Sequence, residues 1–154
     1  MSLQFRLAGP ADHACLESMV IDAFEPVTWS RQIDLRYGPP NGMDWRERWR
    51  HRMRNVFATE TILLGEAGGE IVACATGAVD AAGIGFIDIL CVHRRRQGRG
   101  YGREMLRAML DYFRKQGATH CHLECLSDND AGNRLYASEG FEEVARSIRW
   151  WIRL

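Results

Sequence analysis

The chain has 154 residues, 46% of them hydrophobic and 26% charged, with 20 basic and 20 acidic side chains. A chain of this length folds as one domain without a metal or disulfide staple. The zero net charge argues against a dominant nonspecific attraction to nucleic acid, and no apolar run reaches the roughly 18 residues that a membrane span needs. The amino terminus also lacks the apolar core of a signal peptide. We therefore expect a single soluble domain over residues 1–154, in the cytoplasm, without nucleic-acid or membrane partners.

The first third of the chain predicts one short strand and two helices around a loop. Residues 4–7 read as a strand, and residues 12–24 carry apolar side chains at helical spacing. Residues 25–42 contain three prolines and an Asn-Gly pair, so we expect a long irregular loop that binds the substrate. A second amphipathic helix follows over about 44–58, with arginines on its polar faces.

The middle of the chain predicts a meander of three strands. Residues 61–66 and 70–79 are joined by Ala67-Gly68-Gly69, a plausible hairpin turn, and residues 85–92 form the third strand.

The last third predicts a strand–helix–strand crossover and a final strand. A helix ending near residue 116 leads into a strand over residues 120–126, which the crossover rule makes parallel to the strand before the helix. A helix over about 131–139 precedes a tail, residues 141–154, whose alternating apolar side chains predict a further strand in the sheet.

The most informative segment is the turn between the third strand and the following helix. Gly98, Gly100 and Gly102 lie within five residues, and five arginines fall between Arg94 and Arg103. Glycines at a helix start let the backbone approach a ligand closely and direct unpaired N–H groups at it, which suits a phosphate or pyrophosphate. The turn lacks the Lys-Ser/Thr of a P-loop, and its glycine spacing differs from the dinucleotide-binding fingerprint.

These residues resemble the GNAT superfamily of acetyl-CoA-dependent N-acetyltransferases. The family signature is Arg or Gln, two variable residues, Gly, one variable residue, then Gly or Ala, and Gln97, Gly100 and Gly102 match it. A second family motif follows at the expected distance as Leu123-Glu124-Cys125, Asn129, Leu135-Tyr136 and Gly140-Phe141. The glutamate in it is similar to that of the subfamily that acetylates ribosomal-protein amino-terminal alanine.

The resemblance implies a mixed α/β (α+β) fold. We expect a mostly antiparallel central sheet of about six to seven strands, flanked by about four helices, with a parallel strand pair around the cofactor-binding helix. The short tail leaves the seventh strand open.

The resemblance also implies acetyl-CoA as cofactor. The strand backbone would pair with the pantetheine arm, the turn would hold the pyrophosphate, and Asn129 would bind the cofactor or merely cap a helix. The implied cofactor-binding residues are Leu90, Cys91, Val92, Gln97, Gly98, Arg99, Gly100, Tyr101, Gly102, Arg103, Asn129 and Tyr136.

Three side chains are implied as catalytic. Tyr136 matches the family tyrosine that protonates the departing thiolate, although a core aromatic is the competing interpretation. Glu124 is the first candidate base, and Asp88, on the neighbouring strand, is the second. Either carboxylate could instead be simply solvated or hydrogen-bonded.

Neither a metal nor a cysteine nucleophile is expected. Strand alternation sends the histidines and cysteines of residues 120–125 to opposite faces, so they cannot converge on one ion. Cys91 and Cys125 read as core thiols, and we expect no disulfide among the five cysteines.

The leading hypothesis is therefore transfer of the acetyl group of acetyl-CoA to a primary amine by direct attack in a ternary complex. The acceptor could be a peptide amine or a small molecule, held by Glu25, Trp29 and Tyr37 in the predicted loop. The alternative is a non-catalytic acyl-CoA-binding module that contacts a partner protein. The resemblance also allows a homodimer through the late strands, with Trp150 and Trp151 at the interface or equally in the core.

Overall fold

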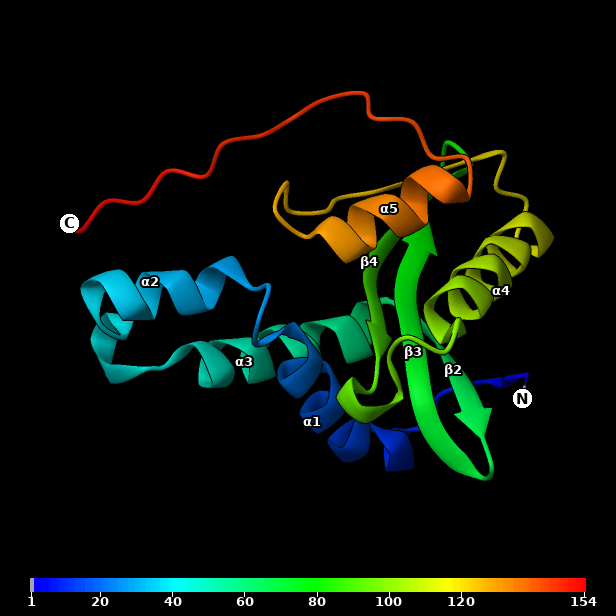
Figure 1. Cartoon of the computed structure of the whole chain (residues 1–154), viewed down its shortest axis with the longest axis horizontal. Helices are drawn as coiled ribbons and strands as arrows, with labels where there is room; N and C mark the ends of the chain where they lie inside the picture. The colour runs from blue at the N-terminus through cyan, green and yellow to red at the C-terminus, as the bar shows by residue number, and fades with distance from the viewer. Residues whose placement is uncertain (1) are drawn as a thin grey trace.

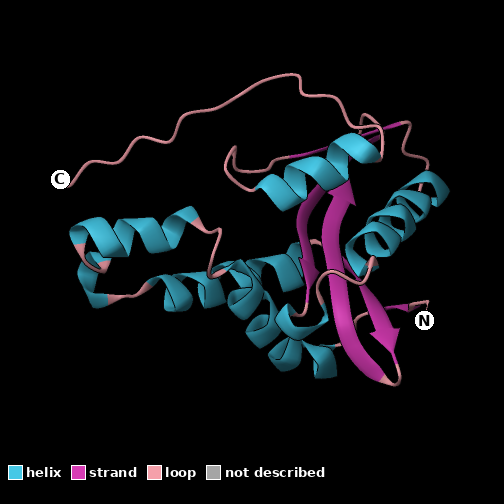
Figure 2. Ribbon diagram, viewed as in Figure 1, coloured by secondary structure: helices cyan, strands magenta, loops and turns pink. Residues whose placement is uncertain are grey.

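The computed structural model describes residues 2–154 and places one five-stranded sheet at the centre of the molecule (Figures 1 and 2). Its strands lie in chain order, and each pairs antiparallel with the next except for the parallel pair β4 and β5. Their bounds are β1 Gln4–Leu7, β2 Thr61–Ala67, β3 Glu70–Val79, β4 Ile84–Val92 and β5 His120–Leu123.

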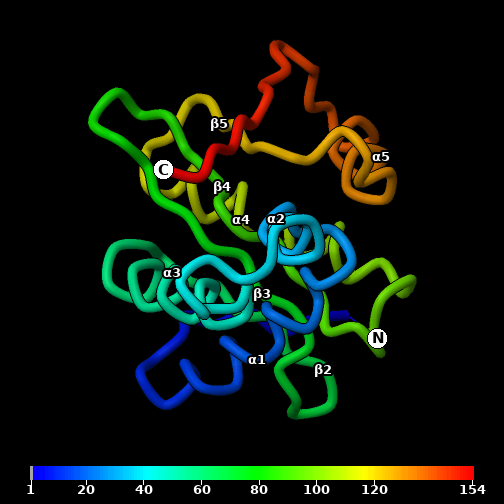
Figure 3. Tube along the Cα trace, turned by 90° about the vertical axis from the view of Figure 1, so that its left-hand side faces the viewer, coloured from blue at the N-terminus to red at the C-terminus, as the bar shows by residue number. Residues whose placement is uncertain are grey.

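Five α-helices accompany the sheet within residues 2–154. Helices α1 and α3 pack on one face of the sheet and α4 on the other, so the centre of the molecule has three layers (Figure 3). The helices are α1 His13–Phe24, α2 Trp29–Tyr37, α3 Trp45–Thr59, α4 Tyr101–Lys115 and α5 Asp130–Ser138, with short 3-10 turns at Pro10–Asp12, Pro40–Gly42 and Arg94–Arg96.

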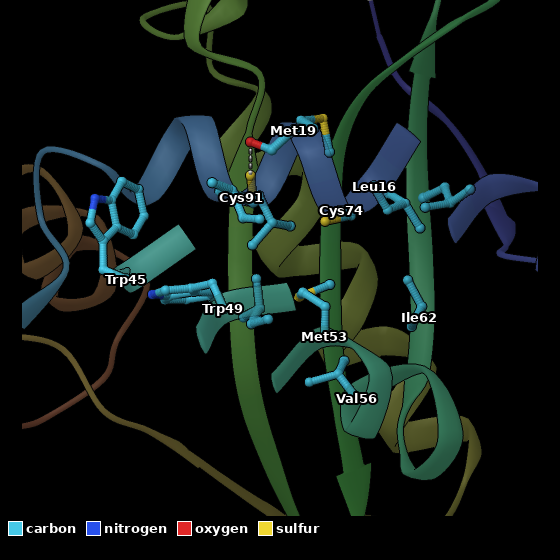
Figure 4. Packing of buried hydrophobic residues seen from close by; sticks show 13 residues of the cluster. Leu16, Met19, Trp45, Trp49, Met53, Val56, Ile62, Cys74 and Cys91 are labelled. Atoms are coloured by element: carbon cyan, nitrogen blue, oxygen red, sulfur yellow. Dashed lines mark hydrogen bonds between the residues drawn. The ribbon is translucent and has the colours of Figure 1, made fainter. Parts of the chain in front are cut away.

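The first core lies between the sheet and the pair α1 and α3 (Figure 4). Leu16 and Met19 of α1 meet Trp49, Met53 and their neighbours on α3, as the helical spacing of these residues predicts. The Cys91 thiol of β4 lies 3.8 Å from the Met19 carbonyl oxygen, to which it donates a weak hydrogen bond.

The second core lies between the sheet and α4. Met105, Leu106, Met109 and Phe113 form one fully buried stripe along this helix. Because the stripe fixes the rotation of α4, it also fixes the direction in which the glycine-rich turn at its amino end faces.

The prediction of an irregular loop over residues 25–42 is wrong, because half of this segment, Trp29–Tyr37, forms α2. Thr28 begins the helix by accepting a hydrogen bond from the Ser30 amide, and Gly38, with φ of 77°, ends it. Only Ile33 of this helix is buried. The helix is held mainly by polar contacts to α3, which apolar periodicity does not reveal: the Asp34 carboxylate binds the Trp45 amide at 2.6 Å and the Arg48 guanidinium at 2.8 Å.

The prediction of a final strand over residues 141–154 is also wrong. The tail contains neither helix nor strand, and it runs extended from α5 past α2 to the carboxyl terminus (Figure 1). The sheet therefore has five strands rather than about six or seven, and α2 raises the helix count from about four to five. The alternation of apolar side chains in the tail indicated a strand, but it contained no information on a pairing partner, and the tail pairs with none of the strands within residues 2–154.

The mixed, mostly antiparallel sheet with one parallel pair around α4 is confirmed. Among residues 2–154, none of the helices combines the length and the apolarity that crossing a membrane requires.

Candidate functional site

Strands β4 and β5 separate halfway along β4. They pair in parallel only from Ile84 opposite His120 to Ile87 opposite Leu123. The β4–β3 register shifts at the same place, since Thr76 faces Ile89 and Gly77 faces Ile87, so Asp88 is the extra residue of a β-bulge. From Ile89 to Val92, β4 keeps β3 on one side and has no strand on the other within residues 2–154.

This free edge of β4 contains three residues that the sequence assigned to the cofactor. Leu90 and Val92 are half-buried on the α4 side, and Cys91 is buried against α1. An extended ligand arm with amide groups can pair with such an edge as an added strand.

The glycine-rich turn follows at once and leads into α4. Gly98 and Gly100 have φ of 76° and 84°, a left-handed conformation that favours glycine over other residues. Gly100 is the residue before α4, and no side chain caps this end of the helix. Within residues 2–154, none of the amide N–H groups from residue 97 to residue 102 donates a hydrogen bond. The turn therefore forms the amino end of a 15-residue helix with its amide donors free, an arrangement that suits an anion.

The side chains around the turn add positive charge. Arg96 pairs with Glu70 at 2.7 Å and Arg103 with Glu139 at 2.8 Å, while Arg94, Arg95 and Arg99 form no ion pair within residues 2–154. The Gln97 side chain donates to the Val92 carbonyl oxygen at 3.2 Å, which ties the turn to the end of β4. Arg96, Arg99 and Tyr101 line a hollow of about 390 Å³ beside the turn. A phosphate-bearing ligand fits this arrangement of donors and charge.

Tyr136, on α5, packs at the edge of the α4-side core. Its ring lies edge-on to Phe141 at 6.0 Å, and its hydroxyl makes no hydrogen bond within residues 2–154. Burial, with a smaller contribution from Cys125, raises the pKa of Tyr136 to about 12. The hydroxyl therefore stays protonated at neutral pH and is free to donate to a ligand.

The other residues of the second motif take different positions. The Asn129 side chain accepts from the Gly132 amide at 3.2 Å, which is the capping role that competed with cofactor binding. Glu124 lies one residue beyond β5 and is exposed. The neighbouring His122 ring stands 4.9 Å from that of Phe86, whereas Leu123 joins the α4-side core, so the predicted alternation of this strand is confirmed.

Asp88 and Glu60 form a pair of carboxylates where β4 and β5 separate. Asp88 binds the Arg52 guanidinium of α3 at 2.6 Å. Glu60, between α3 and β2, accepts from the Thr76 hydroxyl at 2.6 Å. Burial and the nearby Asp88 raise the pKa of Glu60 to about 7, against the opposing effects of Thr76 and Arg52.

The sequence did not single out Glu60. It occupies the single residue between a helix and a strand, where neither helical nor strand periodicity assigns it a face. The cross-strand pairing that brings it to Thr76 could have been inferred only from the register of the sheet.

The thiols near the site are poor nucleophiles. A sulfur contact with Cys74 and burial hold the pKa of Cys91 well above its usual value, and burial raises that of Cys125. Thiols with raised pKa values contain little thiolate at neutral pH.

The three residues predicted to bind the substrate lie on or just before α2, and each is placed differently. The Glu25 carboxylate pairs with Arg46 at 3.0 Å. The Trp29 ring, 38% exposed, lies under the guanidinium of Arg149 at 4.5 Å. Tyr37 is exposed at the far end of the helix. The structure does not bring these three side chains to one point.

Comparison with known proteins gives one family and several structural relatives. Residues 26–141 match the model of the acetyltransferase (GNAT) family. The N-alpha-acetyltransferase RimI of Mycobacterium tuberculosis (strain ATCC 25618 / H37Rv) is 46% identical over 55 residues, which are 36% of this chain and 33% of that protein. The match thus spans about a third of the length of this curated relative.

Solved structures resemble the fold over nearly the whole chain. The ribosomal-protein-S18-alanine N-acetyltransferase of Escherichia coli aligns with a TM-score of 0.71 at 19% identity, over 93% of this chain and 79% of that one. AAC(6')-Iy, in complex with a bisubstrate analog that joins CoA to an acetylneamine, aligns with a TM-score of 0.68 at 13% identity, over 100% of both chains. At these identities the likeness concerns the fold.

Proposed function

Because this chain belongs to the acetyltransferase (GNAT) family, we propose that it is an acetyl-CoA-dependent N-acetyltransferase acting on a primary amine. The observation that supports the proposal most strongly is the combination of the free β4 edge with the unpaired amides of residues 97–102. The first suits an amide-bearing arm and the second a pyrophosphate, and the two are contiguous along the chain.

The residues that would hold acetyl-CoA follow from this arrangement. The backbone of Leu90 to Val92 would pair with its arm, and the amides of residues 97–102 with Arg99 would bind its phosphates. Bound acetyl-CoA would supply an acetyl thioester as the electrophile. The side chains of Tyr101 and Gln97 would act by shaping the turn, since Tyr101 is buried and Gln97 donates a hydrogen bond to the Val92 carbonyl oxygen.

Two faces of the sheet meet at the separation of β4 from β5. Tyr136 belongs to the α4 side, whereas the Asp88 carboxylate turns toward α3, where it meets Arg52. This placement suits a transfer in which the amine arrives on the α3 side and the thiolate departs on the α4 side.

Proton transfer completes the proposed mechanism. An alkyl amine is almost wholly protonated at pH 7, so a carboxylate oxygen of Glu124 or of Asp88 accepts the proton before the nitrogen attacks. The Tyr136 Oη–H donates a proton to the departing sulfur. Glu60 lies beside Asp88 and can receive the proton from it.

The acceptor class is proposed from the charges around α2. The carboxylates that could attract a polycation are already engaged: Glu25 with Arg46, Asp34 with Arg48, and Asp44 as the cap of α3. This pattern favours the α-amine of a peptide, in line with the name of the relative, N-alpha-acetyltransferase RimI, over a polycationic small molecule.

The first experiment is thermal unfolding with and without saturating CoA on two variants of one residue. A Cβ on Gly102 meets Leu135 and Val92 at ordinary distances of 3.5 and 3.7 Å, so Gly102→Ala should fold and bind as the wild type does. Gly102→Glu places a carboxylate at the phosphate-binding end of α4 and should lose the ligand. Ligand at about 100 times its dissociation constant adds roughly 2.7 kcal/mol of stability, which is several degrees here.

The result expected is a CoA-induced shift in the wild type and Gly102→Ala that disappears in Gly102→Glu. An equal shift in all three proteins would overturn the assigned turn. Activity is then measured as CoA release with an alanine-ended peptide and with a polycationic amine. Tight CoA binding without turnover on either acceptor would favour the non-catalytic acyl-CoA-binding module.

A further inference from the structure

Helix α5, to which Tyr136 belongs, has little apolar packing of its own. It lies on the α4 side of the sheet (Figure 1), and none of its residues is buried. Of its apolar side chains, only Leu135 and Tyr136 pack against the α4-side core, and both are half-buried. The Tyr136 hydroxyl makes no hydrogen bond within residues 2–154. The place of this hydroxyl therefore depends on how α5 as a whole is held.

The carboxylate of Glu139 binds the end of α5 to α4. One oxygen accepts from the Nε of Arg107 at 2.6 Å, and the other accepts from Arg107 at 3.0 Å and from Arg103 at 2.8 Å. Arg103 also donates to the Ser138 hydroxyl at 3.1 Å. The two arginines cover Glu139, whose side chain is only 6% exposed, and they lower its pKa, Arg107 more than Arg103. Glu139 is therefore an ionised, fully engaged acceptor at neutral pH.

These bonds connect α5 to the glycine-rich turn. Arg103 directly follows Gly102 in the first turn of α4, at the end that suits the phosphates of the cofactor. Leu135 lies over the same turn, since a Cβ on Gly102 would lie 3.5 Å from it. Because Arg103 is engaged by Glu139, it fastens α5 at this end of α4.

Glu139 is also close to Tyr136 along the helix. The two residues are three positions apart, which places them on the same face of α5. Directly after Glu139, Gly140 turns the chain with φ of 90°. This turn returns Phe141 to the α4-side core, where its ring lies edge-on to that of Tyr136 at 6.0 Å. The bonds of Glu139 thus fix the segment that packs against Tyr136.

We propose that Glu139 is a positioning residue for the transfer, which fixes α5 on the amino end of α4 and thereby sets the place of the Tyr136 hydroxyl relative to the cofactor turn. The inference rests on the proposed function, in which Tyr136 protonates the departing thiolate. Ion pairs with exposed arginines contribute little to global stability, whereas a displacement of about 1 Å at a reacting group can lower turnover by about 10²-fold. Loss of Glu139 should therefore affect Tyr136 more than the stability of the whole chain.

Fluorine NMR of protein labelled with 3-fluorotyrosine reports the place of Tyr136 without any acetyl transfer. The chain has four tyrosines, and the signal that Tyr136→Phe removes is that of Tyr136. Glu139→Ala and, as a second variant, Arg107→Ala should shift this signal and leave the other three in place. The matched control Glu143→Ala, which removes a carboxylate paired with Arg146 inside the tail, should leave all four in place. An unmoved Tyr136 signal in Glu139→Ala, or a shift of all four, would overturn the proposal.

Steady-state kinetics separate positioning from damage to the cofactor turn. Glu139→Ala should lower kcat by about tenfold or more. Its KM for acetyl-CoA should stay the same or fall, because Arg103 loses its carboxylate partner and becomes a free cation beside the turn. The double variant Glu139→Ala/Tyr136→Phe should be no slower than Tyr136→Phe alone, since the positioned group is already absent. A further loss in the double variant, or a raised KM for acetyl-CoA with unchanged kcat, would overturn the proposal.

Failure of this inference and failure of the proposed function give different results. If Tyr136→Phe turns over at the wild-type rate, the acid of the proposed function is wrong, and the fluorine signal alone decides whether Glu139 places Tyr136. If Tyr136→Phe is slow while Glu139→Ala is as fast as the wild type, only the role of Glu139 is wrong.

Discussion

Tyr136 is the side chain whose removal most directly tests the proposed chemistry. Its hydroxyl has no partner within residues 2–154 and a pKa raised by burial to about 12, so it is a protonated donor throughout the physiological range. Tyr136→Phe should lower kcat by about 10²-fold or more, because the departing thiolate loses its acid, and should leave CoA binding unchanged. Steady-state kinetics with Tyr112→Phe as the control, a half-buried tyrosine on α4, measure this. Unchanged turnover in Tyr136→Phe would contradict the role.

Glu60 should make stability depend on pH in a definite direction. Its pKa of about 7 in the folded chain lies above the usual 4.5, so the folded state retains a proton that the unfolded state has lost between these values. The free energy of unfolding therefore falls as pH rises from about 4.5 to 7. Above pH 7, Glu60 causes no further change. We expect a loss of about 1–2 kcal/mol, after allowing for solvent screening at a half-exposed group.

Urea unfolding at several pH values checks this dependence. Glu60→Gln, which mimics the protonated side chain, should remove that fall, whereas Glu142→Gln, an exposed glutamate of the tail, should leave it in place. Identical pH profiles for the wild type and Glu60→Gln would refute the assignment.

At the scale of elements, the polar attachment of α2 to α3 should matter for the acceptor more than for the cofactor. The Asp34 carboxylate binds both the Trp45 amide and Arg48, and Arg48 also donates to the carbonyl oxygens of Ser30 and Met43. Asp34→Asn removes the charge and should destabilise the protein by about 1–3 kcal/mol. It should also raise KM for the amine while the CoA-induced thermal shift persists. Asp22→Asn, exposed on α1, is the control, and equal effects of the two variants would contradict the prediction.

Some helices and strands could be predicted from the sequence pattern and others could not. The periodic stripe of α4 and the glycines before it were sufficient to predict this helix, its turn and the parallel strand pair, since these depend on local pattern. Helix α2 was missed because it buries a single side chain, Ile33, and depends on Arg48, which comes later in the chain. The same distance in sequence hid the pairing of Glu60 with Thr76.

At the scale of the whole molecule, the arginines of α3 show how a zero net charge is distributed. Four of them are paired with carboxylates from other parts of the chain: Arg46 with Glu25 at 3.0 Å, Arg48 with Asp34 at 2.8 Å, Arg50 with Glu17 at 3.5 Å and Arg52 with Asp88 at 2.6 Å. Trp45 and Trp49 of this helix are buried, and Phe57 is half-buried and stacked on His13. The arginines and tryptophans of α3 therefore hold this helix to the rest of the protein. Its composition is typical of a surface that binds nucleic acid through basic and aromatic side chains, but the placement of these side chains is not.

This charge pairing predicts that the protein binds nucleic acid weakly. Fluorescence anisotropy with a labelled single strand should give a dissociation constant above about 10⁻⁴ M near physiological salt, since binding depends on unpaired cations that release counterions. Replacing Glu17 and Glu25 by glutamine removes the partners of Arg50 and Arg46. The double variant should bind nucleic acid more tightly, and its affinity should rise more steeply as the salt concentration falls. Glu142→Gln makes the same charge change as either single replacement, but Glu142 has no arginine partner in α3, so this variant should change neither property. Tight, salt-sensitive binding by the wild type would contradict this prediction.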